Sequence, residues 1–328
     1  MHYAAPTLTM GGKFFTMALG LLAFAAVVAV ILLLAALAER RGGRRRVAWL
    51  FILPTVTLLV VGLIYPALRT MLRSLYNAAG TSFIGLDNYL TIFQSDDQLL
   101  VLRNTVLWVL VTPFVATAVG LLYAILVDGA RGESIAKAMI FLPMAISFVG
   151  ASIIWKFIYE YRQEGVPQIG LLNQVIVWLG GTPSQFLVGT PWNTFFLIVV
   201  MIWIQAGFAM TILSASIKAI PGEIVEAARL DGVGAVQMFR FVTLPSIRPS
   251  VVVVLTTIAI GCLKVFDIIR TMTGGAFGTS VVANEFYSQS FSAGNQGLGA
   301  ALAVLLFVLV IPIVIYNIRQ MRASESQR

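Results

Sequence analysis

Seven long apolar runs constrain the fold of this chain more than any other feature of its sequence. Each run is long enough to cross about 30 Å of hydrocarbon, which takes roughly 20 helical residues. In a membrane only helices and closed barrels satisfy their own backbone groups, and the runs lack the alternation of barrel strands. We therefore predict seven membrane-spanning helices, at Phe14 to Ala38, Val47 to Leu68, Asn104 to Val127, Ala138 to Ile158, Asn193 to Leu213, Pro249 to Ile269 and Leu298 to Ile318.

The composition agrees with a chain whose solvent is lipid. Hydrophobic residues make up 59% of the 328 residues and charged residues only 11%, whereas about 25% of residues are charged in soluble proteins. The net charge of +8 is spread between the apolar runs, which indicates topology signals instead of a surface for nucleic acid. The apolar segment Ile169 to Trp178 is too short to cross, so we expect it at the membrane surface.

Lysine and arginine in the short loops predict the orientation, because these residues resist translocation. If the loop from Glu39 to Arg46 is cytoplasmic, fourteen of the 22 basic residues lie inside, seven lie outside and Lys264 lies within a span. This two-to-one bias predicts that the N-terminus is outside and the C-terminus inside. One long loop, Ser214 to Arg248, then faces the cytoplasm.

The first half of this cytoplasmic loop has the signals of a short helix. Pro221 suits a first helical position, and Glu223 and Glu226 complement the positive end of the helix dipole. Gly232 can adopt the left-handed conformation that stops a helix. We therefore predict a helix that ends just before Gly232.

The second half of the loop predicts another short helix with an apolar face. Val236, Phe239 and Val242 recur at every third residue and form an apolar stripe, and Pro245 is expected to end the element. A loop without a soluble domain of its own has little to bury such a stripe against. The partner expected is another protein with a groove for a helix, and a helix resting on the membrane surface remains as an alternative.

Three short motifs in this loop resemble the EAA signature of ABC importer permeases: Glu226-Ala227-Ala228, Asp231-Gly232 and Leu244-Pro245. In that family the matching loop is a coupling helix that docks in a cleft of the ATPase subunit. The resemblance implies that the residues that couple this chain to an ATPase are Glu226, Ala227, Ala228, Asp231, Gly232, Phe239, Leu244 and Pro245.

Further segments are similar to the first permease subunit of α-glucoside or maltose-type importers. They are FIGLDNYLTIF at Phe83 to Phe93, and LKVFDIIRTMTGG and GLGAALAVLLFVLVIP near the end of the chain. The resemblance implies an all-α, multi-pass protein of the bacterial cytoplasmic (inner) membrane. Its polytopic helical bundle would be the six-span core of a type I ABC importer permease with one extra N-terminal helix.

The same resemblance implies the division of the chain and its partners. Residues 1–46 would hold the extra helix and a basic cytoplasmic loop, 47–320 the transport domain with its coupling loop at 214–248, and 321–328 a cytoplasmic tail. The partners implied are a second permease subunit in a heterodimer, two ATP-binding cassette ATPase subunits and an extracytoplasmic sugar-binding protein. The cargo would be a small oligosaccharide such as an α-glucoside.

The spans before and after the cytoplasmic loop, Asn193 to Leu213 and Pro249 to Ile269, carry the side chains expected along a sugar path. A sugar needs polar groups beside an aromatic face. Thr257, Gly261 and Lys264 fall on one helical face at i, i+4 and i+7. The sugar contacts of the family come from the same two helices, and the positions that match them are Met201, Ile204, Gln205, Phe208, Thr257, Ile260, Gly261 and Lys264. From these we select as the predicted substrate path Gln205, Phe208, Thr257, Gly261 and Lys264.

Lys264 has two interpretations. At 1.5 Å per residue it lies about 22 Å along a helix that begins near Pro249, past the midplane but still in hydrocarbon, where a lone lysine is costly. It either pairs with Asp267 one turn on, with Arg270 completing a cluster, or contacts the sugar directly. Trp203 and Phe208 stand out with Gln205 on the span before the cytoplasmic loop as candidates for the sugar path, and for these two aromatic residues helix packing is the alternative.

The sequence argues against catalysis by this chain. No G-x-x-x-x-G-K-[ST] phosphate loop is present, so ATP would be bound and hydrolysed by a partner and no cofactor is expected. The single histidine, His2, and the single cysteine, Cys262, exclude a metal cluster built from these residues and an internal disulfide. An ion-coupled secondary transporter remains as the alternative function, although such proteins usually show internal repeats and several ionisable residues at the midplane.

Overall fold

The structure is a computed structural model that describes residues 15, 17–20, 22, 25, 28–30 and 44–325. The chain divides into two compact units, Met1–Arg69 and Thr70–Arg328, which are described separately. Most of the predicted first span, Phe14 to Ala38, and most of the basic loop after it lie outside the described residues. The described residues form helices and loops, with a single isolated bridge between Tyr76 and Phe83, so the predicted all-α fold is confirmed.

The second predicted span is a continuous helical segment. It begins with α2 (Arg44–Leu59), passes through the π-helical turn η1 (Val60–Ile64) and ends with α3 (Tyr65–Arg73). The part from Phe51 to Arg73 is long and apolar enough to cross a membrane, and none of its most apolar window is buried.

The second unit, Thr70–Arg328, is called unit 2 and is built around α9 (Asn193–Lys218). In the most apolar window of α9, 56% of residues are buried, against 33% or less in the other spans. A Cβ on Gly120 of α5 (Asp96–Val127) would lie 2.5 Å from the Cβ of Ala209, and one on Gly207 would lie 2.5 Å from the carbonyl oxygen of Ile140. Small residues therefore let α9 approach its neighbours on two sides.

The predicted span from Ala138 to Ile158 is broken. α6 (Glu133–Phe141) is followed by the 3-10 turn η2 (Leu142–Ala145) and then by α7 (Phe148–Ile158), and the two helices are bent by 102°. Pro143 lies in the turn, and the Ser147 hydroxyl caps α7 by accepting from the amide of Gly150 at 3.1 Å. A proline and a helix cap interrupt this apolar run, which hydropathy alone predicts as one straight helix.

The span predicted from Pro249 to Ile269 is shifted toward the N-terminus. The continuous helical segment comprises α11 (Ala235–Gln237), the π-helical turn η3 (Met238–Thr243) and α12 (Leu244–Leu263). Pro245 was predicted to end a helix, and this is wrong: it lies in the first turn of α12, directly after the π-helical turn. The continuous segment accommodates the proline next to the π-helical turn, where the regular helical hydrogen-bond pattern is already interrupted.

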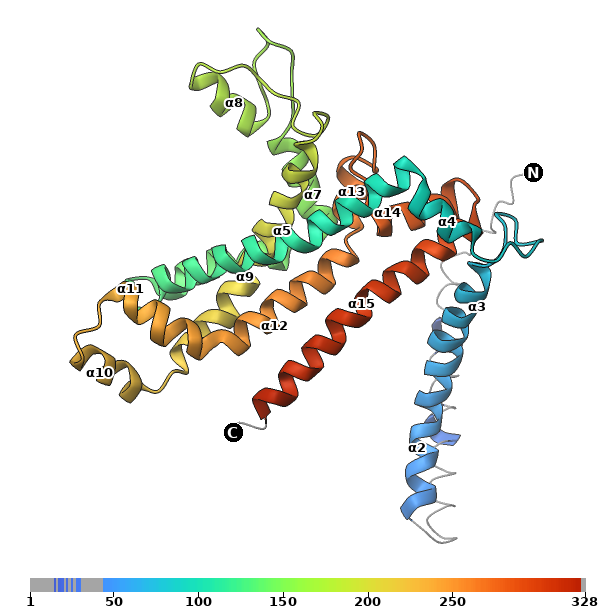
Figure 1. The fold of residues 1–328 in the computed structure, drawn as a ribbon, viewed down its shortest axis with the longest axis horizontal. Coiled ribbons are helices and arrows are strands. Elements are labelled where there is room, and N and C mark those ends of the chain that lie inside the picture. The colour runs from blue at the N-terminus through green and yellow to red at the C-terminus, as the bar shows by residue number, and fades with distance from the viewer. Residues whose placement is uncertain are drawn as a thin grey trace. The chain divides into compact units, whose positions relative to one another are not determined.

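Unit 2 also contains several shorter helices, which lie away from the cytoplasmic loop predicted at Ser214 to Arg248. They are α4 (Asp87–Gln94), α8 (Leu171–Trp178), α13 (Asp267–Met272), α14 (Val282–Tyr287) and the π-helical turn η4 (Ser288–Ser292). Two amides fix the segment between α13 and α14: Asn104 donates to the carbonyl of Gly278 at 2.6 Å, and Asn193 to that of Phe277 at 2.7 Å. Figure 1 shows these helices away from α10 and α11.

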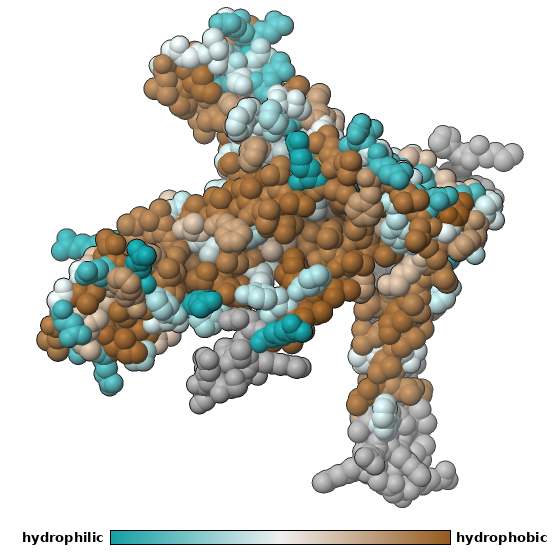
Figure 2. Space-filling model, in the orientation of Figure 1, coloured by the Kyte–Doolittle hydropathy of each residue, from teal (hydrophilic) through white to brown (hydrophobic). Residues whose placement is uncertain are grey.

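The described residues contain five helices that could each cross a membrane, or six if the bent pair counts as one span. The last is α15 (Gln296–Glu325), which covers the predicted span from Leu298 to Ile318 and reaches into the predicted tail. Figure 2 shows hydrophobic side chains over the middle of unit 2 and a mixture of hydrophilic and hydrophobic ones at the end with α10 and α11. The count of seven spans and their orientation stay predictions.

Candidate coupling loop and substrate path

The loop after α9 forms the short helix that the sequence predicts. α10 (Gly222–Leu230) ends before Gly232, whose φ of +75° confirms the predicted left-handed conformation. Pro221 is the residue before the helix and not its first residue, because its ψ of 131° is extended. No atom lies within 4 Å of a Cβ built on Gly232, so the backbone alone demands glycine there.

The structure places the predicted coupling residues in two settings. Glu226 of α10 is exposed. Leu230, which was not among the predicted residues, is 90% exposed on the same helix, and this is unusual for a leucine outside a membrane or an interface. Half-buried positions are Ala228 and Phe239, and the remaining exposed positions are Ala227, Asp231, Gly232, Leu244 and Pro245. α10 therefore offers an acidic and apolar surface.

The predicted stripe of Val236, Phe239 and Val242 does not form one face. Val236 is 79% exposed, whereas Phe239 and Val242 are half-buried. Phe239 lines a cavity of about 440 Å³ between this segment and the ends of α5 and α9. The π-helical turn inserts an extra residue into the helical period, so the three residues do not return to the same face. Phe241 of this turn is exposed, and the Arg240 guanidinium lies 5.7 Å from its ring centre.

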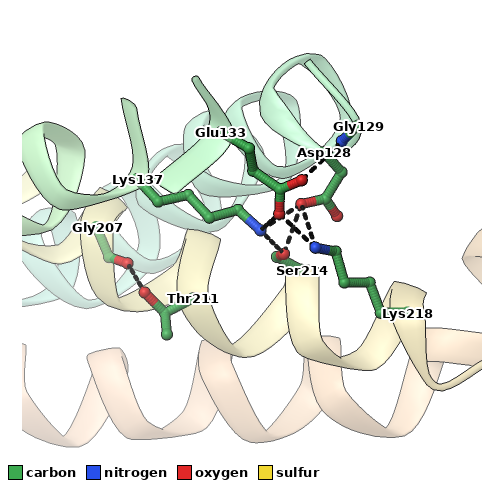
Figure 3. Close-up of polar contacts among 8 residues, drawn as sticks. All are labelled: Asp128, Gly129, Glu133, Lys137, Gly207, Thr211, Ser214 and Lys218. Carbon is green, nitrogen blue, oxygen red and sulfur yellow. Dashed lines mark hydrogen bonds and ion pairs between the residues drawn. The ribbon is translucent and has the colours of Figure 1, made fainter. Parts of the chain in front are cut away.

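A network of four charged residues, which the sequence analysis missed, joins three helices beside this loop. Figure 3 shows Lys137 of α6 and Lys218 of α9 converging on Glu133 and Asp128. Lys137 Nζ lies 2.7 Å from Glu133 Oε1 and also pairs with Asp128, whereas Lys218 pairs with Glu133 and lies 3.9 Å from Asp128 Oδ1.

Uncharged groups complete this ionic network. Ser214 donates to Asp128 Oδ1 at 2.7 Å and accepts from Lys137, and the amide of Gly129 donates to Glu133 Oε2 at 3.0 Å. The network fastens the end of α5, the start of α6 and the end of α9 to one another. The i, i+4 spacing of Glu133 and Lys137 was the only signal for it in the sequence.

Two residues of the predicted substrate path meet across α9 and α12. A Cβ on Gly261 would lie 3.8 Å from the amide nitrogen of Gln205 and 3.8 Å from the terminal methyl of Met201. The Gln205 side chain is half-buried and makes no hydrogen bond within residues 44–325. Phe208, one turn further along α9, is also half-buried, and Thr257 is exposed. A free amide beside an aromatic ring is suited to a sugar.

Lys264 does not lie inside a helix as predicted. It is the exposed residue that follows α12, because the helix ends at Leu263 and a new one begins at Asp267. The expected pair with Asp267 is wrong, since the ion pairs within residues 44–325 all belong to the network around Asp128. Arg270 instead lies over the ring of Tyr287, 4.8 Å from its centre.

Trp203 packs between helices, as its alternative interpretation proposed. Its ring centre lies 5.8 Å from that of Trp155 on α7 in an edge-to-face arrangement. Tyr159, which follows α7, continues the aromatic cluster with Phe186 and Phe196. These contacts hold α7 and α9 together beyond the bend.

Comparisons with known proteins agree with the geometry of the loop and the bundle. Residues 100–322 match the family of binding-protein-dependent transport system inner membrane components. The osmoprotective compounds uptake permease protein GgtC of Synechocystis sp. (strain PCC 6803) is 45% identical over 279 residues, which cover 85% of this chain and 100% of GgtC. The alpha-glucoside transport system permease protein AglF of Rhizobium meliloti is 46% identical over 272 residues, 83% of this chain and 81% of AglF.

A solved structure shares the fold. A bacterial ABC transporter involved in the import of the acidic polysaccharide alginate has a chain that superposes with a TM-score of 0.73 at 23% sequence identity. The superposition covers 85% of this chain and 96% of that one. The family match covers more than half of the sequence, and it confirms the resemblance seen in the EAA signature. This chain therefore belongs to the family of binding-protein-dependent transport system inner membrane components.

Proposed function

We propose that this chain is the permease subunit of an ATP-driven importer in the bacterial inner membrane, and that its cargo is a small oligosaccharide such as an α-glucoside. The observation that carries the proposal is the loop at 221–232. It presents an exposed Glu226 and a 90% exposed Leu230 on a helix closed by a left-handed glycine. A chain of this family needs such a surface to receive an ATPase.

The cargo class rests on the relatives and on the residues of the path. The names of GgtC and AglF refer to osmoprotective compounds and to alpha-glucosides. In this chain the free amide of Gln205 faces Gly261 beside the half-buried ring of Phe208. The amide can both donate to and accept from sugar hydroxyls.

The partners proposed are a second permease subunit, two ATP-binding cassette ATPase subunits and an extracytoplasmic sugar-binding protein. The chain itself would be non-catalytic and would need no cofactor, because ATP would be bound by the ATPase subunits. The ion-coupled alternative is not supported, since the matched family consists of transport components that depend on binding proteins.

The test is uptake of a labelled α-glucoside by vesicles that contain the complete complex and its binding protein. Uptake is expected to require ATP in the compartment of the ATPase and to persist when ionophores abolish the proton and sodium gradients. Uptake that continued without ATP and stopped with the ionophores would contradict the proposal. A competition series with other sugars then identifies the preferred cargo.

A further inference from the structure

A cavity of about 440 Å³ separates the coupling loop from the helices that it would drive. Its walls come from α5, α9, α10 and the segment α11–η3. The residues that line it are Ile125, Asp128, Ile217, Arg229, Val233, Ala235, Met238, Phe239 and Thr243. Apart from Thr243, the two charged residues are its only polar side chains.

Asp128, which lines this cavity, has one side-chain oxygen without a partner. Its Oδ1 atom is satisfied by Ser214 at 2.7 Å and by Lys137, with Lys218 at 3.9 Å. Its Oδ2 atom is buried and has no hydrogen-bond partner within residues 44–325. A buried carboxylate oxygen without a partner is costly, and it is stabilised strongly when a charged donor reaches it.

Arg229 lines the same cavity from the side of the coupling loop. It belongs to α10, three residues after Glu226, and it makes no ion pair with Asp128 in this conformation. Its guanidinium has five donors in a planar fork, which suits a carboxylate that already uses one oxygen elsewhere. α10 is short and is followed by the turn at Gly232, so a push on α10 would move Arg229 with it.

We propose that Arg229 binds Oδ2 of Asp128 when this cavity closes, and that the pair transmits the movement of α10 to α5. Asp128 is then a positioning residue of transport. The ionic network fixes Asp128 through its Oδ1 atom at the wall of the cavity, and the loop supplies the matching cation only in the closed state. This inference rests on the proposed function, because it takes α10 to be the element that the ATPase moves.

The first test is a double-mutant cycle in the reconstituted complete complex. It compares Arg229→Gln, Asp128→Asn and the two together, and the quantity measured is sugar transported per ATP hydrolysed. Arg229→Gln is expected to lower this ratio about tenfold. In the Asp128→Asn background the same change is expected to have less than about twofold effect, because its partner is already lost. Equal factors in both backgrounds would overturn the proposal.

Two matched variants separate a specific pair from a general loss of charge. Arg229→Lys keeps the cation and is expected to restore part of the ratio. Arg131→Gln removes an exposed arginine close to Asp128 in the sequence that does not line the cavity, and it is expected to leave the ratio unchanged. A loss with Arg131→Gln as large as that with Arg229→Gln would contradict a specific role for the pair.

A second measurement follows closure itself and leaves both charges in place. Val233→Cys introduces a thiol into the cavity wall, and the native Cys262 is buried. A small methanethiosulfonate reagent is expected to label it at least about fivefold more slowly in the vanadate-trapped complex than without nucleotide. Adding Arg229→Gln is expected to remove this protection, and unchanged labelling in all four samples would overturn the proposal.

The outcomes also distinguish this inference from the proposed function. If Glu226→Lys uncouples the complex while the Arg229 and Asp128 variants transport normally, the loop is the coupling element and only the pair is wrong. If none of these variants alters coupling, the role of the loop itself fails.

Discussion

Gly232 fixes the backbone at the end of α10, the helix that we propose docks on the ATPase. Its φ of +75° strains any other residue by roughly 1 to 2 kcal/mol. Gly232→Val is therefore expected to insert and assemble normally but to abolish sugar-stimulated ATP hydrolysis. Gly222→Val is the matched control, since Gly222 has equally open space without the positive φ. Measurement of ATPase activity in vesicles at equal permease content checks both, and full stimulation with Gly232→Val would contradict the prediction.

Glu226 tests the chemistry of the same surface. It is exposed on α10, and a charge-assisted hydrogen bond to a basic group of the ATPase would be worth roughly 1.5 to 3 kcal/mol. Glu226→Lys is expected to weaken association of the ATPase by about tenfold or more, and Glu226→Gln by less. Binding of purified ATPase to vesicles measures this, and equal affinity of all three proteins would remove Glu226 from the interface.

Gln205 is the residue through which the predicted substrate path can be tested. Its amide has no partner within the described part of the chain and faces Gly261. Gln205→Leu keeps the volume and removes one or two hydrogen bonds to the sugar, so the half-saturating sugar concentration is expected to rise roughly fivefold to thirtyfold. A normal concentration dependence with Gln205→Leu would place the path elsewhere.

At the scale of elements, the close crossing of α5 and α9 depends on Gly120 of α5. A Cβ on Gly120 would lie 2.5 Å from Ala209 Cβ and 2.7 Å from the Met210 amide, and neither is the end of a flexible side chain. Gly120→Ala is therefore expected to force the helices apart at a cost of about 1 to 3 kcal/mol. Thermal unfolding in detergent measures the loss, and Gly261→Ala, whose nearest atoms are 3.8 Å away, is expected to be close to wild type. Equal unfolding temperatures for all three proteins would contradict this.

At the scale of the whole molecule, the untested prediction is the topology. The basic residues predict that the N-terminus is outside and that the loop from Glu39 to Arg46 is cytoplasmic. In a background with Cys262 replaced, an impermeant thiol reagent applied to intact cells is expected to label Thr7→Cys and not Gly42→Cys. The reverse pattern would invert the topology and place the coupling loop outside.

The sequence by itself determined what depends on local chemistry. Apolar runs predicted helices because lipid leaves the backbone no other partner, and the glycine of the EAA signature predicted the left-handed turn at Gly232 because a side chain strains that conformation. The same motifs identified the family. These features require only near neighbours in the chain, so the order of residues contains them.

Only the tertiary structure decided which distant side chains meet. Asp128 and Ser214 are 86 positions apart, and their contact at 2.7 Å arises because α5 and α9 pack closely through Gly120. The bend after α6 follows from a proline turn and a helix cap that hydropathy does not register, and hydropathy likewise does not show that α12 ends before Lys264. The free oxygen of Asp128 is a property of the packed loop, since whether a buried polar atom finds a partner depends on every element around it.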